Sequence, residues 1–348
     1  MKWLGLLVLL VLVFMLLILY LGYHFSAPGY QGAVSYHFNG KTFENATPVR
    51  TRFLDVLKWK WTSSPQAWPQ HVPLTFKPDI QYPIPSKAFR LTFINHDTFL
   101  IEADHLRILT DPIWSKRASP FSMLGPKRVH DPGLPFSELP PIDVVLISHN
   151  HYDHMDIQTL KALQKRCRPL FITGLGNKAF LIQQGLQNVV ELDWWDSIQV
   201  KGWTLTFTPA KHFSSRGLFD RNQTLWGGFV AKSATGATLY FAGDTGFDPF
   251  FKAIATQLGP IDVALLPIGA YEPTWFMKPV HCNPAEAVQA HQLLGAKQSF
   301  GMHWGCFQLT DEAREQPLAE LASALNQAHI PTAAFKVLQP GQTTLVPF

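Results

Sequence analysis

The chain has 348 residues, of which 47% are hydrophobic and 16% are charged, with a formal net charge of +4. This hydrophobic content is ample for a large packed core and excludes a mostly disordered chain. The lysines and arginines are scattered, so no nucleic-acid partner is expected, and three cysteines are too few for a disulfide framework or a cysteine-rich zinc site.

Residues 3–23 form an uncharged, almost wholly apolar run. As a helix rising ~1.5 Å per residue, about 20 residues span a ~30 Å hydrocarbon layer. A cleaved signal peptide is the alternative, but its apolar region is commonly only about 7–15 residues long and ends in a small-x-small site. The longer run, with Tyr20 and Tyr23 as interfacial aromatics, predicts a retained single-pass membrane anchor over residues 1–23.

The charges that flank this run predict its orientation. Lys2 lies on its short side, and the next lysine or arginine after the run is Lys41. Because positive residues favour the cytoplasmic side, we expect a cytoplasmic amino terminus and a catalytic domain on the non-cytoplasmic, periplasmic side.

Residues 24–85 are rich in Pro, Trp, Lys and turn formers without sustained periodicity, which predicts an amino-terminal extension with mostly irregular structure. Residues 86–348 are predicted to form one catalytic domain, since no repeat, low-complexity tract or charge run marks a further boundary. Within it, Phe89 to Ile101 alternates around the turn-like Asn95-His96-Asp97 and predicts a β-hairpin. A third short strand is expected at residues 107–109.

Short apolar strands and helical stretches alternate after this hairpin. Residues 144–147 read as a strand and residues 156–167 as a helix. This alternation is typical of an α/β protein.

The segment SHNHYDHMD, residues 148–156, directly follows the strand that ends at Ile147. It places four potential metal ligands within six residues, and imidazole with carboxylate is a ligand mixture that suits zinc. Solvated loop histidines are the alternative, but H-x-H-x-D-H is far more specific than a lone His. The predicted ligands are His149, His151, Asp153 and His154.

A metal site needs further ligands from other strand ends, and three candidates are present. Residues 205–208 lead to His212, residues 238–241 lead to Asp244, and residues 300–302 precede His303. Each residue alone is more often a surface or core side chain. Together with the first cluster they lie where α/β folds gather their sites, so we predict that they also bind metal.

The pattern H-x-H-x-D-H followed by a spaced His, Asp and His resembles the metallo-β-lactamase superfamily. The resemblance implies an α/β fold, a four-layer αβ/βα sandwich, with a dinuclear metal centre between the sheets. It implies catalytic roles for Asp153 and Asp244. It also implies two ligand sets and a bridge: His149, His151 and His212 on one metal, Asp153, His154 and His303 on the other, and Asp244 between them.

A closer likeness covers the chain from about Asp111 to Glu312. It resembles N-acylphosphatidylethanolamine-hydrolysing phospholipase D and its bacterial relatives in the stretches DPIWSKRASPFSMLGPKR, SHNHYDHMD, ELDWWD, LWGGF, FAGDTGFDP, PIGAYEPTWFMKPVH and HWGCFQLTDE. The likeness implies a phosphodiesterase acting on a phospholipid or a small phosphodiester at the membrane. The residues up to about Ser86 have no counterpart in that likeness, so they help to decide which substrate enters.

Two metal ions ~3.5–4 Å apart can share a hydroxide and lower the pKa of bound water toward ~7, and this hydroxide would attack phosphorus. We expect two zinc ions rather than manganese or iron. A di-iron member of the superfamily typically has Glu where this chain has His151.

Two other functions stay open at this point. The same metals hydrolyse lactones, cyclic phosphodiesters and other soluble esters, and a non-catalytic metal-binding envelope protein belongs to a different class. The narrow family segments and the predicted anchor favour a phospholipid, and the complete ligand set argues against lost catalysis. The physiological substrate and the oligomeric state are not predicted.

Residues near the ligands have weaker assignments. Asp156 either accepts from a ligand imidazole or caps the following helix. Lys127 and Arg128 are expected in a solvated turn rather than on a phosphate, and Trp194-Trp195 in packing. By the family resemblance, the substrate mouth would be lined by Tyr271 and Trp275.

Overall fold

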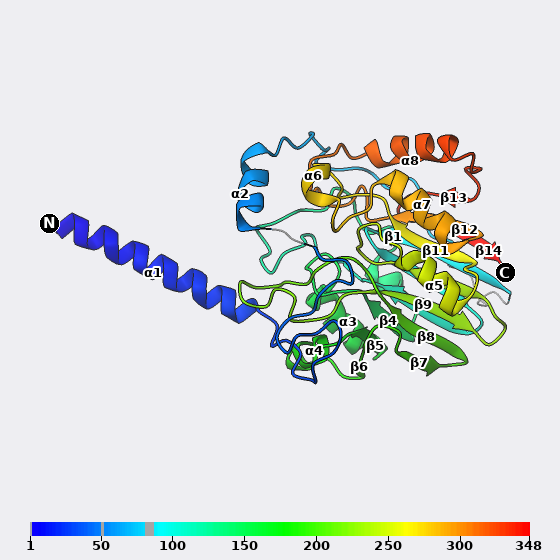
Figure 1. Ribbon diagram of the computed structural model, residues 1–348, viewed down its shortest axis with the longest axis horizontal. Coiled ribbons are helices and arrows are strands. Elements are labelled where there is room, and N and C mark those ends of the chain that lie inside the picture. The colour runs from blue at the N-terminus through cyan, green and yellow to red at the C-terminus, as the bar shows by residue number, and fades with distance from the viewer. Residues whose placement is uncertain (1, 50–51, 81–86) are drawn as a thin grey trace.

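The computed structural model describes residues 2–49, 52–80 and 87–348. Two seven-stranded mixed sheets pack face to face, in the orders β14-β1-β2-β3-β4-β5-β6 and β13-β12-β11-β10-β9-β8-β7 (Figure 1). The first sheet contains β1 (Ala88–Asn95), β2 (Thr98–Ala103), β3 (Leu106–Thr110), β4 (Val144–Ile147), β5 (Leu170–Gly174), β6 (Val189–Leu192) and β14 (Thr343–Pro347). The second contains β7 (Ser197–Val200), β8 (Trp203–Thr208), β9 (Gly228–Ser233), β10 (Thr238–Phe241), β11 (Val263–Pro267), β12 (Gln298–Met302) and β13 (Phe335–Lys336).

Helices cover the outer faces of both sheets. The first sheet carries α3 (Ile157–Arg166) and α4 (Asn177–Gln183), and the second carries α5 (Phe250–Leu258), α7 (Pro284–Leu294) and α8 (Gln316–Gln327). Shorter helices are η1 (Phe136–Glu138) and α6 (Thr274–Met277). The four-layer αβ/βα sandwich predicted above is therefore confirmed.

Strand β4 shows why an apolar run without alternation forms a strand in this fold. Val144 and Leu146 belong to the core between the two sheets, whereas Val145 and Ile147 belong to the core beneath α3 and α4. Because successive side chains of a strand point to opposite faces, a strand buried on both sides must be apolar throughout. The strand therefore leads from the middle of the protein straight to the polar segment that begins at Ser148.

Most elements that the sequence predicts are present with small changes in their ends. The predicted hairpin is β1 and β2, the third strand is β3, and the helix after the histidine segment is α3. Asp156 accepts a hydrogen bond from the backbone N–H of Gln158, so it caps this helix.

The extension contains one helix that sequence periodicity does not reveal, α2 (Phe53–Thr62). Trp59, on one face of α2, stacks on Phe276 of α6, with the ring centroids 5.0 Å apart. At its first turn, the Asp55 carboxylate accepts from the backbone N–H of Arg52. A helix of 10 residues is marginal alone, and this tertiary contact is what stabilises it.

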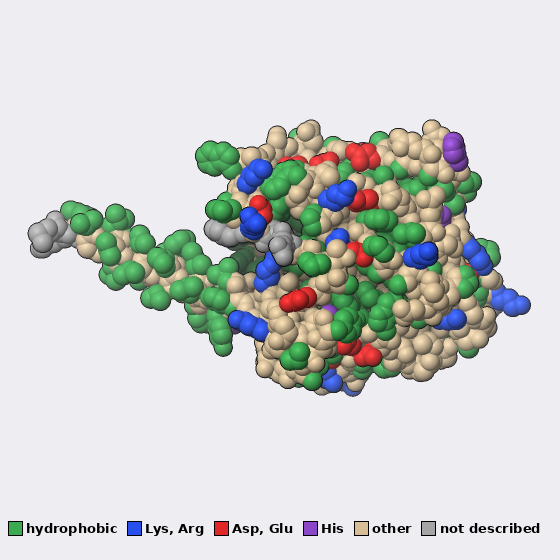
Figure 2. Space-filling view, viewed as in Figure 1, with side chains coloured by type: hydrophobic (Ala, Val, Ile, Leu, Met, Phe, Trp, Pro, Cys, Tyr) green, Lys and Arg blue, Asp and Glu red, His purple; other side chains and the backbone are tan. Residues whose placement is uncertain are grey.

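The amino-terminal helix α1 (Lys2–Phe25) projects away from the two sheets (Figure 1). By length and composition it can cross a membrane, and none of its apolar window is buried against the rest of the protein. Figure 2 shows its surface as almost continuously hydrophobic. Its carboxyl end is attached to the two-sheet domain, where Leu218 N–H donates to the carbonyl of Gly22 and Phe219 N–H donates to Ser26 Oγ just after the helix.

Candidate metal centre

Segments that follow four strands meet at one edge of the sandwich. The segment from His149 to His154 follows β4 of the first sheet. His212, Asp244 and His303 follow β8, β10 and β12 of the second sheet. Both sheets therefore supply side chains to the same place.

Gly243 shows how closely the two sheets approach at this edge. Its backbone has a φ of 59°, and a Cβ placed on it would lie 2.5 Å from the Cβ of Ser148. Glycine is the residue that fits both the conformation and the space. The close approach sets Asp244 beside the segment that follows β4.

Asp244 lies at the centre of the predicted ligands. Its Oδ2 is 3.2 Å from His154 Nε2 and 3.7 Å from His212 Nε2, and its Oδ1 is 3.1 Å from His303 Nε2. The Nε2 atom of His149 is 4.0 Å from the same Oδ2. One carboxylate thus touches the side chains that follow all three other strands.

His151 and Asp153 complete the group. His151 Nδ1 is 2.8 Å from His149 Nε2 and 3.3 Å from His212 Nε2. Asp153 Oδ2 is 3.3 Å from His154 Nε2. The structure therefore brings together all seven side chains that the sequence singles out, and none of them lies apart.

The donor atoms of this group fit a divalent cation. Among the residues that the structure describes, His154 Nε2, His303 Nε2 and Asp244 Oδ1 are buried without a hydrogen-bond partner. An unpaired buried polar atom costs about 1–3 kcal/mol, and a shared cation would satisfy all three atoms. Ligand atoms ~2.1 Å from a tetrahedral zinc are roughly 3.4 Å apart, similar to the separations around Asp244.

The second nitrogen of three rings is held away from the group. His212 Nδ1 donates to the carbonyl of Val280 at 2.9 Å, and His154 Nδ1 donates to Asp111 Oδ2 at 2.7 Å. Ser148 donates its hydroxyl to Asp111, so it accepts from His149 Nδ1 at 2.8 Å. These contacts fix the tautomer and orient the remaining nitrogen of each ring toward the ligand group.

The pKa values of these groups follow from burial and from the two carboxylates. Burial lowers the pKa of His151 to about 4 and that of His212 to about 3, so both rings are neutral, as metal ligands must be. Burial alone would also lower the pKa of His154 and His303, but Asp244 and neighbouring carboxylates raise both well above the ordinary value. The carboxylates thus require positive charge beside them, which a divalent cation would supply.

Four further polar residues lie at this site, and sequence reasoning missed them. His96 Nε2 is 3.0 Å from Asp153 Oδ2, and His281 Nδ1 is 3.9 Å from Asp244 Oδ2. Asp97 is fully buried 3.5 Å from His154, and Asp111 holds the same ring. Asp111 directly follows β3, which is the strand-end position that identified the other candidates. His96 likewise directly follows β1, whereas Asp97 and His281 lie in a turn or a loop with no ligand spacing.

Asn45, from the extension, forms hydrogen bonds with the backbone of His212. The Asn45 amide donates to the His212 carbonyl at 2.8 Å and accepts from the His212 N–H at 3.0 Å. Its oxygen also accepts from Trp226 Nε1 at 3.1 Å. A residue far from the sheets in sequence therefore helps to position a predicted ligand.

A cavity of about 310 Å³ opens over the predicted ligands. The side chain of Trp59 in α2 and that of Phe276 in α6 form part of its wall. The predicted mouth residues Tyr271 and Trp275 are not part of its lining: Tyr271 is buried, and Trp275 lies outside against Lys58. The lining is Val56, Trp59, His151, Asp153, Phe213, Arg221, Asp244, Ala270, Phe276, Met277, Val280, His281, His303, Leu309 and Thr310.

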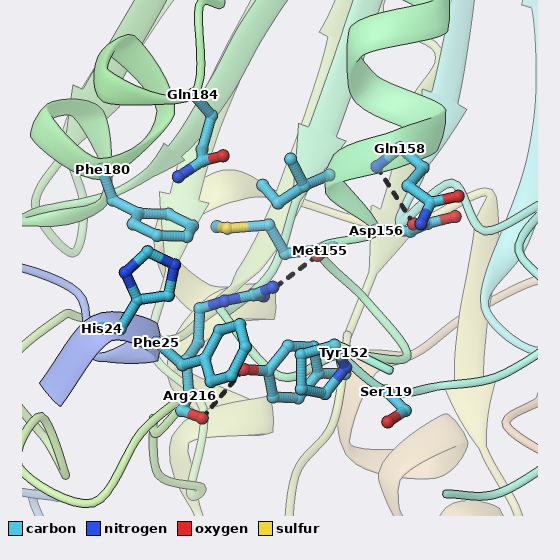
Figure 3. A pocket seen from close by; sticks show the side chains of 12 residues that line it. His24, Phe25, Ser119, Tyr152, Met155, Asp156, Gln158, Phe180, Gln184 and Arg216 are labelled. Carbon is cyan, nitrogen blue, oxygen red and sulfur yellow. Dashed lines mark hydrogen bonds between the residues drawn. The ribbon is translucent and has the colours of Figure 1, made fainter. Parts of the chain in front are cut away.

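A second cavity, of about 250 Å³, lies where α1 meets the domain (Figure 3). Arg216 lies there with its guanidinium over the rings of Tyr152 and Phe180. It donates to the carbonyls of Asn150 and Met155, which belong to the same segment as the first four predicted ligands. This cavity contains no predicted ligand, and its arginine supports the ligand segment from behind.

Lys127, Arg128 and Trp194, the other residues with weaker assignments, all lie outside the ligand group. Lys127 is exposed and Arg128 half-buried, both away from the ligands. Trp194 is buried and donates to the carbonyl of Trp226, as expected for a packing residue.

Comparisons with known proteins agree with this geometry. Residues 106–304 match the family described as Beta-lactamase superfamily domain. An uncharacterized protein of Mycobacterium tuberculosis is 37% identical over 316 residues, covering 88% of this chain and 83% of its own. The N-acyl-phosphatidylethanolamine-hydrolyzing phospholipase D 1 of Caenorhabditis elegans is 40% identical over 247 residues, covering 68% and 69%. The structure of Igni18, a metallo hydrolase from Ignicoccus hospitalis, has a TM-score of 0.56 at 23% identity, covering 75% and 99%, and shows the fold alone.

Proposed function

This chain belongs to the β-lactamase superfamily and is a metal-dependent hydrolase, and from that premise we propose a membrane-anchored, dinuclear zinc phosphodiesterase of the phospholipase D type. The observation that carries the proposal is the convergence of seven metal-ligand side chains beneath a largely apolar cavity. The choice of a phospholipid is supported by the 40% identity to the Caenorhabditis elegans phospholipase D. The expected substrate is N-acylphosphatidylethanolamine or a related phospholipid.

We assign the ligands to two metal ions. Asp244 belongs to two groups of donor atoms, one with His149, His151 and His212 and one with Asp97, His154 and His303. A carboxylate shared by two donor groups is what a bridging ligand requires, so Asp244 would lie between the metals. Asp153 joins His96, His154 and His303 in a further group and would hold the second metal with His154 and His303.

When bound, divalent ions of this kind lower the pKa of a water molecule and neutralise charge on phosphoryl oxygens. The side chains of the chain itself bind and orient the substrate. Trp59 and Phe276 give the cavity an apolar wall that excludes water around the reacting bond. His281 lines the same cavity, and its Nδ1 lies 3.9 Å from Asp244 Oδ2, so its ring would border the metal-bound phosphoryl group.

Zinc is supported by the imidazole-rich ligand set, in which His151 occupies a position that is typically Glu in a di-iron relative. Elemental analysis of protein purified without added metal tests this assignment. About two zinc ions per chain are expected. Iron or manganese in their place would overturn the choice of zinc and leave the ligand assignment standing.

We propose that α1 is retained as a single-pass anchor with the catalytic domain on the non-cytoplasmic side. Its unburied apolar surface supports this proposal, as does its attachment to the catalytic domain at Gly22 and Ser26. A reporter fused to the carboxyl terminus should be active outside the cytoplasm and remain in the membrane fraction. Cytoplasmic activity would reverse the orientation, and release into the soluble fraction would indicate a cleaved signal.

A lipid-hydrolysis assay tests the activity. Metal-replete protein in detergent micelles is incubated with N-acylphosphatidylethanolamine, and phosphatidic acid and N-acylethanolamine are measured. We expect both products, and their loss after chelation. Hydrolysis of lactones or soluble esters without any phospholipid cleavage would point to the alternative substrates, and bound metal without any hydrolysis would favour a non-catalytic role.

A further inference from the structure

Arg221 places a positive charge at the edge of the cavity over the metal site. Its side chain is exposed to solvent on one side, and its guanidinium lies 4.4 Å from the centre of the Phe213 ring. Among the described residues that line the cavity it is the only lysine or arginine. No carboxylate within the described parts of the chain forms an ion pair with it, and partial burial lowers its pKa. Within the described residues, the guanidinium is therefore a cation without a counter-ion.

The Phe213 ring beneath Arg221 also contacts the predicted ligands. Phe213 packs against His151 with ring centroids 4.6 Å apart, and against the adjacent His212 at 4.8 Å. Phe213 thus contacts both the guanidinium and the predicted ligands. The two carboxylates that line the cavity, Asp153 and Asp244, are surrounded by histidines and leave Arg221 unpaired.

The rest of the outer wall is uncharged. Its side chains come from α2, α6 and the segment that contains Leu309: Val56, Trp59, Phe276, Met277 and Leu309. A single cation in an apolar wall fits a ligand in which an anionic group adjoins apolar chains. A neutral ester or lactone would gain nothing from the charge.

We propose that Arg221 is a specificity-determining residue that binds the anionic phosphoryl group of the substrate and selects anionic phosphodiesters over neutral esters and lactones. The proposal rests on the phosphodiesterase activity proposed above. The planar guanidinium suits this role because it can donate two parallel N–H bonds to phosphoryl oxygens. The face of Phe213 holds it in place, which reduces the entropy lost on binding.

The test compares Arg221→Gln and Arg221→Lys with Lys58→Gln, a matched loss of one positive charge on α2 outside the lining. Each metal-replete protein is assayed with bis(p-nitrophenyl) phosphate and with p-nitrophenyl acetate. For Arg221→Gln, we expect KM for the phosphodiester to rise about tenfold, the effect of losing one charge-assisted hydrogen bond, with little change for the neutral ester. Arg221→Lys should recover part of the loss, and Lys58→Gln should behave like the unchanged protein.

A binding measurement separates this proposal from the proposed function. Titration calorimetry of the metal-loaded proteins with inorganic phosphate should show about tenfold weaker binding for Arg221→Gln. If the protein hydrolyses no phosphodiester, the proposed function fails, and phosphate binding alone decides the role of Arg221. Equal phosphate affinity in Arg221→Gln and the unchanged protein, or an equal loss in Lys58→Gln, would overturn the proposal.

Discussion

The two sheets and the extension that precedes them reach the metal site in different ways. The sheets supply all seven predicted ligands, which lie beyond the ends of β4, β8, β10 and β12. The extension supplies none. Its Asn45 forms hydrogen bonds with the backbone of His212, a predicted ligand, and its Trp59 lines the cavity.

We infer that the sheets provide the residues for the reaction, whereas the extension affects which substrate binds. A ligand at the end of a buried strand is fixed by the packing of both cores, so replacing it removes a donor atom without disturbing the fold. The extension packs Phe38 and Phe43 into the core between the sheets and forms hydrogen bonds to loops around the site, but it supplies no predicted ligand. Replacing its residues near the site should therefore change metal affinity or substrate choice by smaller factors.

The largest effect is expected for Asp244→Asn. The carboxylate lies within 4.0 Å of four predicted histidine ligands, and a neutral amide cannot balance two divalent ions. We predict a loss of turnover of at least about 1000-fold in metal-replete protein, with an unchanged circular dichroism spectrum. Asp248→Asn is a matched control, because Asp248 lies nearby but faces Lys211. Full turnover by the Asp244 variant would contradict the bridging role.

Asn45→Ala should have the next largest effect. Without the side chain, the N–H and carbonyl of His212 lose their hydrogen bonds, so the ring is held less firmly. Supporting contacts of this kind commonly contribute 10–100-fold in metal affinity, and we predict a loss in that range on titration with a chelator. Asn39→Ala is the control, because Asn39 bonds only within its own turn. Equal chelator sensitivity of the two variants would place the extension outside the metal site.

Trp59→Ala tests whether α2 selects lipids. The ring lines the cavity and stacks on Phe276, so its loss removes apolar wall while every predicted ligand stays. We expect KM for a long-chain phospholipid to rise about tenfold and KM for a small soluble phosphodiester to change little. Trp61→Ala is the control from the same helix, since the Trp61 side chain is 92% exposed. A similar change for both substrates would argue against lipid selection by α2.

The predicted ligands could be found from sequence because each follows a strand that hydrophobicity alone reveals, and four of them share one short spacing pattern. The sequence places His96 and Asp97 only in a turn, where histidine and aspartate normally form hydrogen bonds with the backbone. His281 lies in a loop without ligand spacing, so only the folded structure places it near Asp244.

Residues of the extension were beyond the reach of sequence patterns for a different reason. Asn45 and His212 are 167 positions apart, and one hydrogen-bonded asparagine leaves no periodic signal. Helix α2 is short and its apolar residues are interrupted by lysines, so its docking on Phe276 appears only in three dimensions. The family resemblance begins at about Asp111 and gives no information there.

The smallest effect at neutral pH is expected for His130, which tests how firmly the extension is attached to the sheets. The extension covers this residue through Val72, whose N–H donates to the Val129 carbonyl, and burial lowers the pKa of His130 to about 4. The Asp131 backbone carbonyl opposes this shift, whereas the nearby Arg314 and Arg128 add to it.

The sign of the pH dependence follows from this depressed pKa. In the unfolded chain His130 has an ordinary pKa of 6.5 and binds a proton between pH 6.5 and 4, whereas in the folded chain it stays neutral over this range. The free energy of unfolding is therefore highest above pH 6.5 and falls as pH drops toward 4. His130→Asn should reduce this acid-induced loss of unfolding free energy by up to about 3 kcal/mol and leave activity at pH 7.5 unchanged. Urea unfolding of the full chain in detergent at pH 7.5 and 4.5 measures the difference. Parallel losses in both proteins would mean that the extension does not keep His130 buried, and its attachment to the sheets would then be weaker than the structure indicates.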